Sequence, residues 1–556
     1  MKLRKLAISL LLTFVFAVPA MASSTWVEDF LRRYDPAKSV STAASTNPAA
    51  TQLRLGEVPL SMNDVINLMI DNNLDIRSNR LSPLSNYWQS IVFYRALQPS
   101  ITLSANRNIN TTLSNSQLNG TVPDVTSRRA NYAVTFAQAL SMGTSIGVTG
   151  TMGRLESTSN LNLYNPSYTG QLTYSIGQHL LQNRGRLPNT RQILSAQNSE
   201  KMSEAAFEIQ LMNLIAQAQK SYWDLVFAGQ DLDVKKRSVD LALSTLEENK
   251  TKVEIGTLAP IDVIQTEADV ASRRELLVIS TSTVTAAEDQ IKKMTSSDKD
   301  PAMFLMKLRT MDLPKPPNAV QIPSLEEAVK IALENRPEIK QALLDIENKD
   351  IDVKYTKNQK LPILDVTGSY TQNGTGGTKY LRGNVIGGAA TTVVPGTVWG
   401  SFGQLFGYNY TGYGMGVSLT IPLNNKAAEA DYERALNEQR LSKSKMDVTT
   451  QQVALDVRNA LVQVEMNRAR IETAKTTREL AQKKMEAEQD KFNLGTSTLR
   501  FVLEEQRNVA MAESNELQAE VNFTKALVDL DKAMGLTLSK NNIELEKTLK
   551  GGATAK

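Results

Sequence analysis

A long helical pattern with a narrow apolar seam constrains this chain more than any other feature. Val457, Leu461 and Val464 step by four and then three positions, which is typical of coiled-coil packing. No proline occurs between Asn425 and Lys556, so no proline forces a helix to break there. At a rise of about 1.5 Å per residue, an arm of roughly 64 residues would span ~95 Å. One antiparallel pair of such helices cannot bury a globular core, so it needs further long helices beside it.

The helical pattern pauses at Gly495 and then resumes to about Gly535. Glycine adopts a positive φ more readily than other residues, so Gly495 predicts a reversal of the chain. A matching pause falls at Gly256 in the first half. We therefore expect two long helical hairpins, over residues 188–295 and 425–534.

The second half of the chain repeats the first. The segment that begins at Ser324 resembles the one that begins at Ser61, and each serine precedes a proline, Pro362 or Pro99, by 38 positions. The offset between the halves is 263 at the prolines and 239 at the glycines, so the first half holds 24 additional residues. This duplication predicts the same order in both halves: helix, strands, long helix, turn and helix.

The predicted organisation follows from the repeat and from the composition between its parts. It comprises a signal peptide at 1–22, an irregular segment at 23–60, a first repeat at 61–300, a Pro-rich linker at 301–323, a second repeat at 324–536 and a polar tail at 537–556. The strands of the two repeats are expected within 100–180 and 363–422.

The first residues have the pattern of an export signal. Lys2, Arg4 and Lys5 precede an apolar run, and Ala22 ends a small-residue cleavage motif, as in secretory signal peptides. Removing the signal lowers the formal net charge from +4 to +1, so no bulk charge favours nucleic acid as a partner. No other apolar run approaches 18 residues. An exported chain of this kind is periplasmic, secreted, or inserted in the outer membrane as strands.

Between the helical regions, apolar residues alternate with polar ones at the period of a β-strand. Four core strands are expected near 100–110, 170–180, 363–371 and 412–422. A further hairpin at 132–152 accounts for most of the additional residues of the first half. Four well-formed strands cannot close a barrel, so we expect strands from several subunits to be pooled. The further hairpin either widens that barrel to eighteen strands or stands outside the membrane, and we favour the second.

Both halves also carry short motifs at their turns and strand ends. They are Gly495-Thr-Ser-Thr-Leu-Arg-Phe-Val-Leu-Glu-Glu-Gln506 with Glu513, Ala526-Leu527, Leu530 and Ala533-x-Gly535, then Ile255-Gly256 through Asp262-Val263, and Gln178-x-Leu180-Leu181. Together with the duplication, these motifs resemble the TolC-type outer-membrane efflux protein family over about residues 58–536. The resemblance implies an α+β membrane protein, a homotrimer with a shared β-barrel in the outer-membrane lipid, and a periplasmic α-helical tunnel. It also implies docking to a periplasmic membrane-fusion adaptor and an inner-membrane pump.

The resemblance also points to the closed tip of the tunnel. The family commonly has acidic residues six and nine positions after the second turn glycine, and this chain has Phe501 and Glu504 there. The family's arginine two positions after that glycine is Ser497 here, whereas its partner acid in the first half is retained as Asp262. Phe501 and Glu504 are therefore our candidates for a pore constriction, with a solvated helix charge as the alternative for Glu504. Arg500 is a possible substitute for the missing arginine.

The two turns are candidate docking points for the adaptor, because the exposed ends of long hairpins are accessible; a plain helical turn is the alternative. The residues concerned are Gly256, Thr257, Asp262, Gly495, Thr496 and Ser497.

No pattern indicates an enzyme, a cofactor or a metal site. The chain has no cysteine and a single histidine, His179, which we interpret as structural rather than as a ligand. Trp88, Trp223 and Trp399 are interpreted as packing or interfacial residues. The predicted function is the exit duct of a tripartite efflux or type I secretion system, a passive conduit whose substrate is set by the pump. The alternative is a periplasmic coiled-coil structural or adhesin-like protein without a channel.

Overall fold

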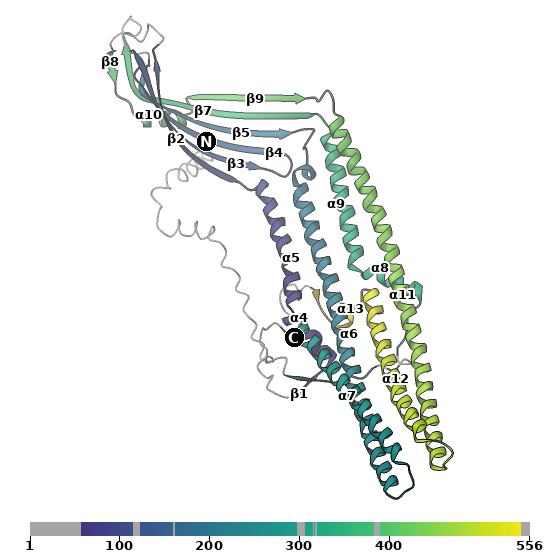
Figure 1. Cartoon of the computed structure of the whole chain (residues 1–556). Helices are drawn as coiled ribbons and strands as arrows, with labels where there is room; N and C mark the ends of the chain where they lie inside the picture. Colours follow the sequence, from purple (N-terminus) through teal and green to yellow (C-terminus); the bar gives the residue numbers. More distant parts are fainter. Residues whose placement is uncertain are drawn as a thin grey trace. The chain divides into compact units, whose positions relative to one another are not determined.

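A computed structural model describes most of the chain (Figure 1). The described residues are 57–114, 123–159, 162–296, 306–314, 316, 320–382 and 390–545. The predicted signal peptide, residues 23–56 and the end of the predicted tail at 546–556 lie outside them. The described residues within 59–304 and 308–556 form one unit, which holds the long helices and the large sheet.

Each repeat begins with a short helix capped by its first serine. Ser61 precedes α4 (Met62–Asn72) and forms a capping box with Asp64. Ser324 precedes α8 (Leu325–Asn335) and accepts a hydrogen bond from the backbone N–H three residues later. Such caps satisfy N–H groups that have no partner within the helix.

A second helix follows in each repeat. It is α5 (Leu74–Val92) in the first repeat, continued by the 3-10 helix η1 (Phe93–Leu97), and α9 (Pro337–Gln359) in the second. The pattern between Ser61 and Pro99 is thus not one helix. Its break lies at Asn73, whose extended backbone and side-chain oxygen cap α5.

The two long hairpins have nearly equal arms. They are formed by α6 (Arg186–Glu254) with α7 (Pro260–Thr295), and by α11 (Lys426–Asn493) with α12 (Leu499–Ala533). The first arms have 69 and 68 residues, and the return arms have 36 and 35. Helix α6 contacts α5, α7, α9 and α12, and α11 contacts α8, α9 and α12. Side by side, α5, α6, α9 and α11 therefore form a layer of long helices (Figure 1).

Among the described residues, two large apolar cores hold the helices together, one mainly in each repeat, and a small cluster around Leu246 joins α6 to α7. The first contains Ile215 and Tyr222 of α6 with the apolar face of α4. The second contains the predicted seam of α11, including Val457 and Val464, packed on Phe523 of α12. Val457, Val464 and Phe523 are fully buried, so the coiled-coil spacing in the sequence correctly predicts the packing face.

Six long antiparallel strands form one sheet, and a short seventh strand is attached to it (Figure 1). The long strands are β2 (Ser100–Leu113), β3 (Asp124–Ala139), β4 (Thr144–Ser157), β5 (Tyr164–His179), β7 (Ile363–Arg382) and β9 (Tyr410–Thr420), and the short one is β8 (Ala390–Val394). Their order is β2-β3-β4-β5-β7-β9, with β8 pairing with the far end of β7. Strands β2 and β9 are the two edges.

One face of the sheet is apolar and the other is polar. One row of paired residues crosses the apolar face: Ile101, Phe136, Val148, Tyr174, Tyr370 and Tyr413. The rings of Tyr370 and Tyr413 lie 5.2 Å apart. The neighbouring row on the polar face is Thr102, Thr135, Thr149, Thr173, Thr371 and Gly412. This alternation is continuous across all six strands.

The hairpin β3–β4, which contains the segment 132–152 that we expected outside the membrane, belongs to the large sheet. Strand β3 pairs with β2 along fourteen residues, and β4 pairs with β5 along twelve. The hairpin separates two strands that the second repeat joins directly as β7 and β9. Inserting two strands preserves the antiparallel alternation, so the apolar face continues across the hairpin without a break.

Two further segments differ from the predictions. The predicted Pro-rich linker contains β6 (Lys307–Thr310), which pairs with β1 (Glu57–Leu60) in a two-stranded sheet. The predicted polar tail begins with α13 (Thr537–Lys540), and Leu538 and Ile543 belong to the first apolar core. Tyr222 joins the same region, because its hydroxyl lies 2.8 Å from Asp312 Oδ2. Burial and this hydrogen bond raise the pKa of Tyr222 to about 12.

Candidate functional site at the hairpin tips

The two hairpins reverse direction in the same way. Gly256 has φ +78° and Gly495 has φ +75°, a backbone conformation that glycine adopts without steric cost. The Thr257 N–H donates to the Lys252 carbonyl at 2.9 Å, and the Thr496 N–H donates to the Lys491 carbonyl at 2.9 Å. Each turn thus closes the end of its helix with the hydrogen bond of a glycine C-cap.

Contacts tie the tips together. Lys252 Nζ of the first hairpin lies 5.6 Å from the centre of the Phe492 ring in the second. Within the second tip, the Ser497 hydroxyl donates to Glu488. Hydrogen bonds from Ser497 and Lys491 hold the pKa of the Glu488 carboxyl below its ordinary value. Ser497, which stands where the family has arginine, is therefore bound within its own hairpin.

The candidate constriction residues lie on one exposed face of α12. Phe501 is 52% exposed, and Glu504, one turn later, is exposed too. The residues between them, Val502 and Leu503, are buried against the other helices. In a single chain, the side chains of Phe501 and Glu504 are thus not buried between the helices. They are free to contact other copies or to line a lumen.

Asp262 and Ser497 are not brought into contact. Asp262 is partly exposed in the first turn of α7, where a carboxylate interacts favourably with the helix dipole. Among the described residues, its side chain makes no hydrogen bond or ion pair. The same is true of Arg500, the possible substitute for the missing arginine.

A buried ionic cluster just above the tips was not predicted from the sequence. Asp269 of α7 lies 2.7 Å from Arg273 Nε and 2.8 Å from Arg507 Nε of α12. Arg273 also donates to the Ser238 carbonyl of α6 and to Gln506 Oε1 of α12. Asp269 and Arg273 are only 2% and 3% exposed. This cluster, the Asp269 cluster below, joins the two hairpins.

The spacing of Asp269 and Arg273 was visible in the sequence as an i, i+4 pair, which usually indicates an exposed salt bridge. Here burial lowers the pKa of the Arg273 guanidinium, and the Asp269 carboxylate opposes that shift. A second pair, Lys484 with Glu505 at 2.7 Å, links α11 to α12 nearby.

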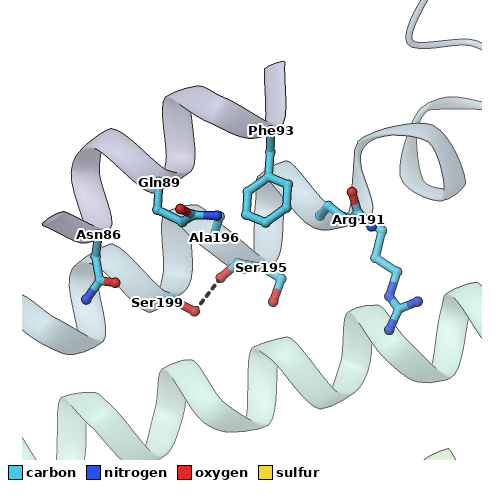
Figure 2. A pocket seen from close by; sticks show the side chains of 8 residues that line it. Asn86, Gln89, Phe93, Arg191, Ser195, Ala196 and Ser199 are labelled. Atoms are coloured by element: carbon cyan, nitrogen blue, oxygen red, sulfur yellow. Dashed lines mark hydrogen bonds between the residues drawn. The ribbon is translucent and has the colours of Figure 1, made fainter. Parts of the chain in front are cut away.

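The described residues contain no group of three or more His, Cys, Asp or Glu side chains suited to a metal ion. His179 lies 2.6 Å from Asp365, across the pair β5–β7. A polar cleft between α5 and α6 includes Asn86, Gln89 and Arg191 (Figure 2). Its only charged side chain, Arg191, is bound to Asp352 at 2.9 Å, so the cleft offers no reactive group.

No described helix is long and apolar enough to cross a membrane.

Comparison with known proteins agrees with the resemblance seen in the sequence. The profile of the outer membrane efflux protein family matches residues 328–536, which confirms that resemblance over most of the second repeat. The matched family is that of outer membrane efflux proteins, which agrees with the expectation that the chain is not an enzyme. No curated protein matches the chain.

Solved structures share the fold over most of the chain. The CmeC outer membrane channel of Campylobacter jejuni has 17% identity and a TM-score of 0.58, over 88% of this chain and 89% of its own. The open-state MtrE outer membrane channel of Neisseria gonorrhoeae has 18% identity and a TM-score of 0.55, over 85% and 89%. The outer membrane protein VceC of Vibrio cholerae has 12% identity and a TM-score of 0.57, over 85% and 96%. These structures show the fold of the chain, and the family match agrees with an outer-membrane efflux protein.

Proposed function

We propose that three copies of this chain form the exit duct of a tripartite efflux or type I secretion system. The duct is a passive conduit that carries small molecules or polypeptides across the periplasm and the outer membrane. It receives them from an inner-membrane pump through a periplasmic adaptor, which docks at the tips around Gly256 and Gly495. The observation that carries the proposal is that both layers of the molecule end in open edges.

The open edges of the sheet are β2 and β9. Within the chain, the two repeats meet through the pair β5–β7. The equivalent strands of the repeat are β9, which corresponds to β5, and β2, which corresponds to β7. Pairing β9 of one copy with β2 of the next would therefore repeat a contact that the chain already makes. Three copies of six strands give eighteen strands, a size at which barrels enclose an aqueous lumen.

The open edges of the helical layer are α5 and α11. Helix α11 carries an exposed apolar side chain at every seventh position: Leu441, Val448, Leu455 and Val462, each 48–65% exposed. The equivalent positions of α6, 239 residues earlier, include Ala216 and Trp223, which are buried. On α5, Leu81 and Trp88 are 62% and 59% exposed, whereas Ile351, the α9 equivalent of Trp88, is 7% exposed.

Within the chain, α6 packs against α9. The equivalent helices α11 and α5 have no such partner in one chain, so α11 would pack against α5 of the next copy. Heterologous contacts of this kind generate a closed ring when the rotation between copies permits it. Burying a Leu or Val side chain contributes about 1.5–3 kcal/mol, so three such seams would stabilise the ring strongly. The apolar face of the sheet would then face lipid and the polar face the lumen.

The proposal is tested by purifying the full chain from outer membranes in mild detergent. We expect native mass spectrometry to detect a trimer and planar bilayers to show stepwise single-channel currents. A monomer that conducts no current would contradict the proposal and support a periplasmic structural protein. That alternative does not explain a sheet whose two faces separate apolar from polar residues across six strands.

A further inference from the structure

A short helix lies on the apolar face of the sheet. It is α10 (Val398–Phe406), in the connection between β8 and β9, and it contacts β7 and β5. Glycines make its close approach possible. A Cβ atom added to Gly374 would lie 2.1 Å from the Ser401 carbonyl oxygen, and one added to Gly376 would lie 2.7 Å from the Ser401 nitrogen. Gly374 pairs with Gly170 of β5, whose own added Cβ would meet Leu405.

The buried and exposed sides of α10 differ in kind. Ser401 and Leu405 are buried against the sheet. The other side carries Trp399, which is 66% exposed, and Phe402, whose ring lies 5.7 Å from Trp399. The Phe406 ring stacks on Phe402 at 6.3 Å. The helix contains no charged residue, and three aromatic side chains lie on its outward side.

Basic side chains lie on the same face of the sheet as α10, on strands β2, β3 and β4. Arg107 and Arg154 lie in one row of paired residues on this face. That row follows the row of Gly374, on the side farther from the helices. The following row holds Arg128 and Glu156. Glu156 lies 3.1 Å from Arg154 and 3.6 Å from Arg128. These two rows therefore carry three arginines and one glutamate beside Ile109, Ala130 and Tyr168, so the apolar face becomes charged there.

We propose that α10 and these arginines form an interfacial anchor for anionic, phosphate-bearing lipid of the surrounding bilayer leaflet. This inference rests on the proposed barrel, because only then does the apolar face meet lipid. The aromatic side of α10 lies at the boundary between acyl chains and head groups, where Trp is favoured. Arg107, Arg128 and Arg154 lie at the level of the phosphates, which attract them.

The position of α10 argues for lipid as the occupant, against a second copy of the chain. In the proposed ring the copies meet at β2 and β9. Helix α10 contacts β5 and β7, and the Ser401 hydroxyl lies 3.9 Å from Met152 Sδ of β4. It therefore lies over β4, β5 and β7, whereas the proposed contact between copies is made by β2 and β9. Its aromatic side is continuous with the apolar face, and the excess of positive charge beside it complements anionic lipid.

Depth-dependent fluorescence quenching tests the aromatic contact. The chain has four tryptophans, so each contribution is measured by difference in reconstituted full-length protein. Bilayers contain phosphatidylglycerol and lipids brominated near the head group or near the chain end. We expect Trp399→Phe to remove most of the quenching by the shallow bromines. The matched control Trp223→Phe, buried within the chain on a proposed periplasmic helix, should remove none. Unchanged quenching in Trp399→Phe would overturn the proposal.

Thermal stability in lipid tests the arginines. Adding phosphatidylglycerol to phosphatidylcholine bilayers should raise the melting temperature of the trimer. The rise should shrink in Arg107→Gln and in Arg154→Gln, and disappear when both are combined. Arg129→Gln, which alters the polar face, is the matched control and should keep the full rise. Free inorganic phosphate should not replace the lipid. An equal rise in the double variant, or the same rise with free phosphate, would contradict a lipid anchor.

A further variant separates this inference from the proposed function. Tyr132 lies on the apolar face in the same row as Gly374. Tyr132→Trp in the Trp399→Phe background should be quenched strongly if the sheet crosses the bilayer. Quenching of the introduced tryptophan without any contribution from Trp399 would overturn the anchor alone. If the introduced tryptophan is not quenched, that result would instead contradict the barrel itself.

Discussion

At the scale of single residues, the two hairpin tips share one backbone conformation but carry different side chains. The turns at Gly256 and Gly495 have the same φ and the same closing hydrogen bonds. Six positions after each glycine, however, the first hairpin has Asp262 and the second has Phe501. Because Phe501 and Glu504 share the exposed face of α12, three copies would place an apolar ring beside an acidic ring.

The first prediction concerns this proposed gate. Three Phe501 side chains on the axis would form a constriction that excludes water, while Glu504 attracts cations. We expect Phe501→Ala to raise the single-channel conductance about twofold or more. Glu504→Gln should lower the preference for cations with little change in conductance. Ser497→Ala is the control and should change conductance little, because Ser497 binds Glu488 within its own hairpin. Wild-type conductance in Phe501→Ala would show that this side chain does not face the pore.

The second prediction concerns the Asp269 cluster. Asp269→Asn leaves Arg273 buried without its carboxylate partner, and breaking a buried pair in this way costs about 3–5 kcal/mol. We therefore expect a clearly lower melting temperature and faster amide exchange in α7 and α12 near the tips. Asp262→Asn, on the same helix but partly exposed, is the matched control and should change stability by less than about 1 kcal/mol. Equal effects of the two substitutions would show that the cluster does not join the hairpins.

At the scale of elements, the sequence predicted those features that have a strong period. The seam through Val457 and Val464 predicted the packing face of α11, and the glycines predicted both turns. Strand β4 was underestimated because glycines such as Gly150 and Gly153 dilute its alternation, although these positions face neighbours in the sheet. Helix α10 was missed because its nine residues include two glycines and lie in a Gly-rich connection. The Asp269 cluster depends on burial, which local spacing does not reveal.

The third prediction concerns the helical seam between copies. Within the chain, Lys340 of α9 lies 3.3 Å from Glu208 of α6. The residue 263 positions before Lys340 is Arg77 of α5, and the residue 239 positions after Glu208 is Asp447 of α11. Both are exposed, and neither forms an ion pair among the described residues. Arg77 and Asp447 thus keep the charges of Lys340 and Glu208, and they would form the equivalent ion pair between neighbouring copies.

Charge reversal tests this seam. Arg77→Glu or Asp447→Lys should each place like charges together at three interfaces, and the trimer should dissociate at a lower detergent concentration or temperature. The two substitutions combined should restore the trimer, with a coupling of about 1 kcal/mol per pair. Lys340→Glu is the control, since it disrupts the equivalent pair inside one chain and should leave the subunits associated. If the double variant is no more stable than the single ones, the two residues do not meet.

At the scale of the whole molecule, the duplication explains why a single chain is incomplete. The contacts β5–β7 and α6–α9 join the first repeat to the second, but the second repeat has no following repeat to meet. In the proposed ring, the first repeat of the next copy takes that place. The ring then contains six repeats in quasi-equivalent positions, although each first repeat adds the hairpin β3–β4. An eighteen-stranded barrel with a polar lumen is wide, so the narrowest point of the conduit is expected at the hairpin tips.

The last prediction fixes the register between copies. Ile176 of β5 pairs with Gly368 of β7, and the repeat offsets convert this pair into Met415 of β9 and Ala105 of β2 in the next copy. Directly opposed residues of antiparallel strands have Cα atoms about 4.5–5.5 Å apart, which suits a disulfide. The chain has no cysteine, so Met415→Cys with Ala105→Cys introduces the only thiols. Oxidation should give covalent dimers and trimers on a denaturing gel, and reduction should return them to monomers.

Two matched pairs show whether this cross-link reports the register. Ile176→Cys with Gly368→Cys should lose its free thiols on oxidation yet remain a monomer on the gel, because those strands belong to one chain. Met415→Cys with Leu103→Cys is displaced by two residues on the same face and should cross-link poorly, since diagonal neighbours lie about 7–8 Å apart. Stronger cross-linking of the displaced pair would mean that the edges meet in another register. Cross-linking of neither pair, with the internal control oxidised, would mean that β9 and β2 do not meet and that the duplication is not continued between subunits.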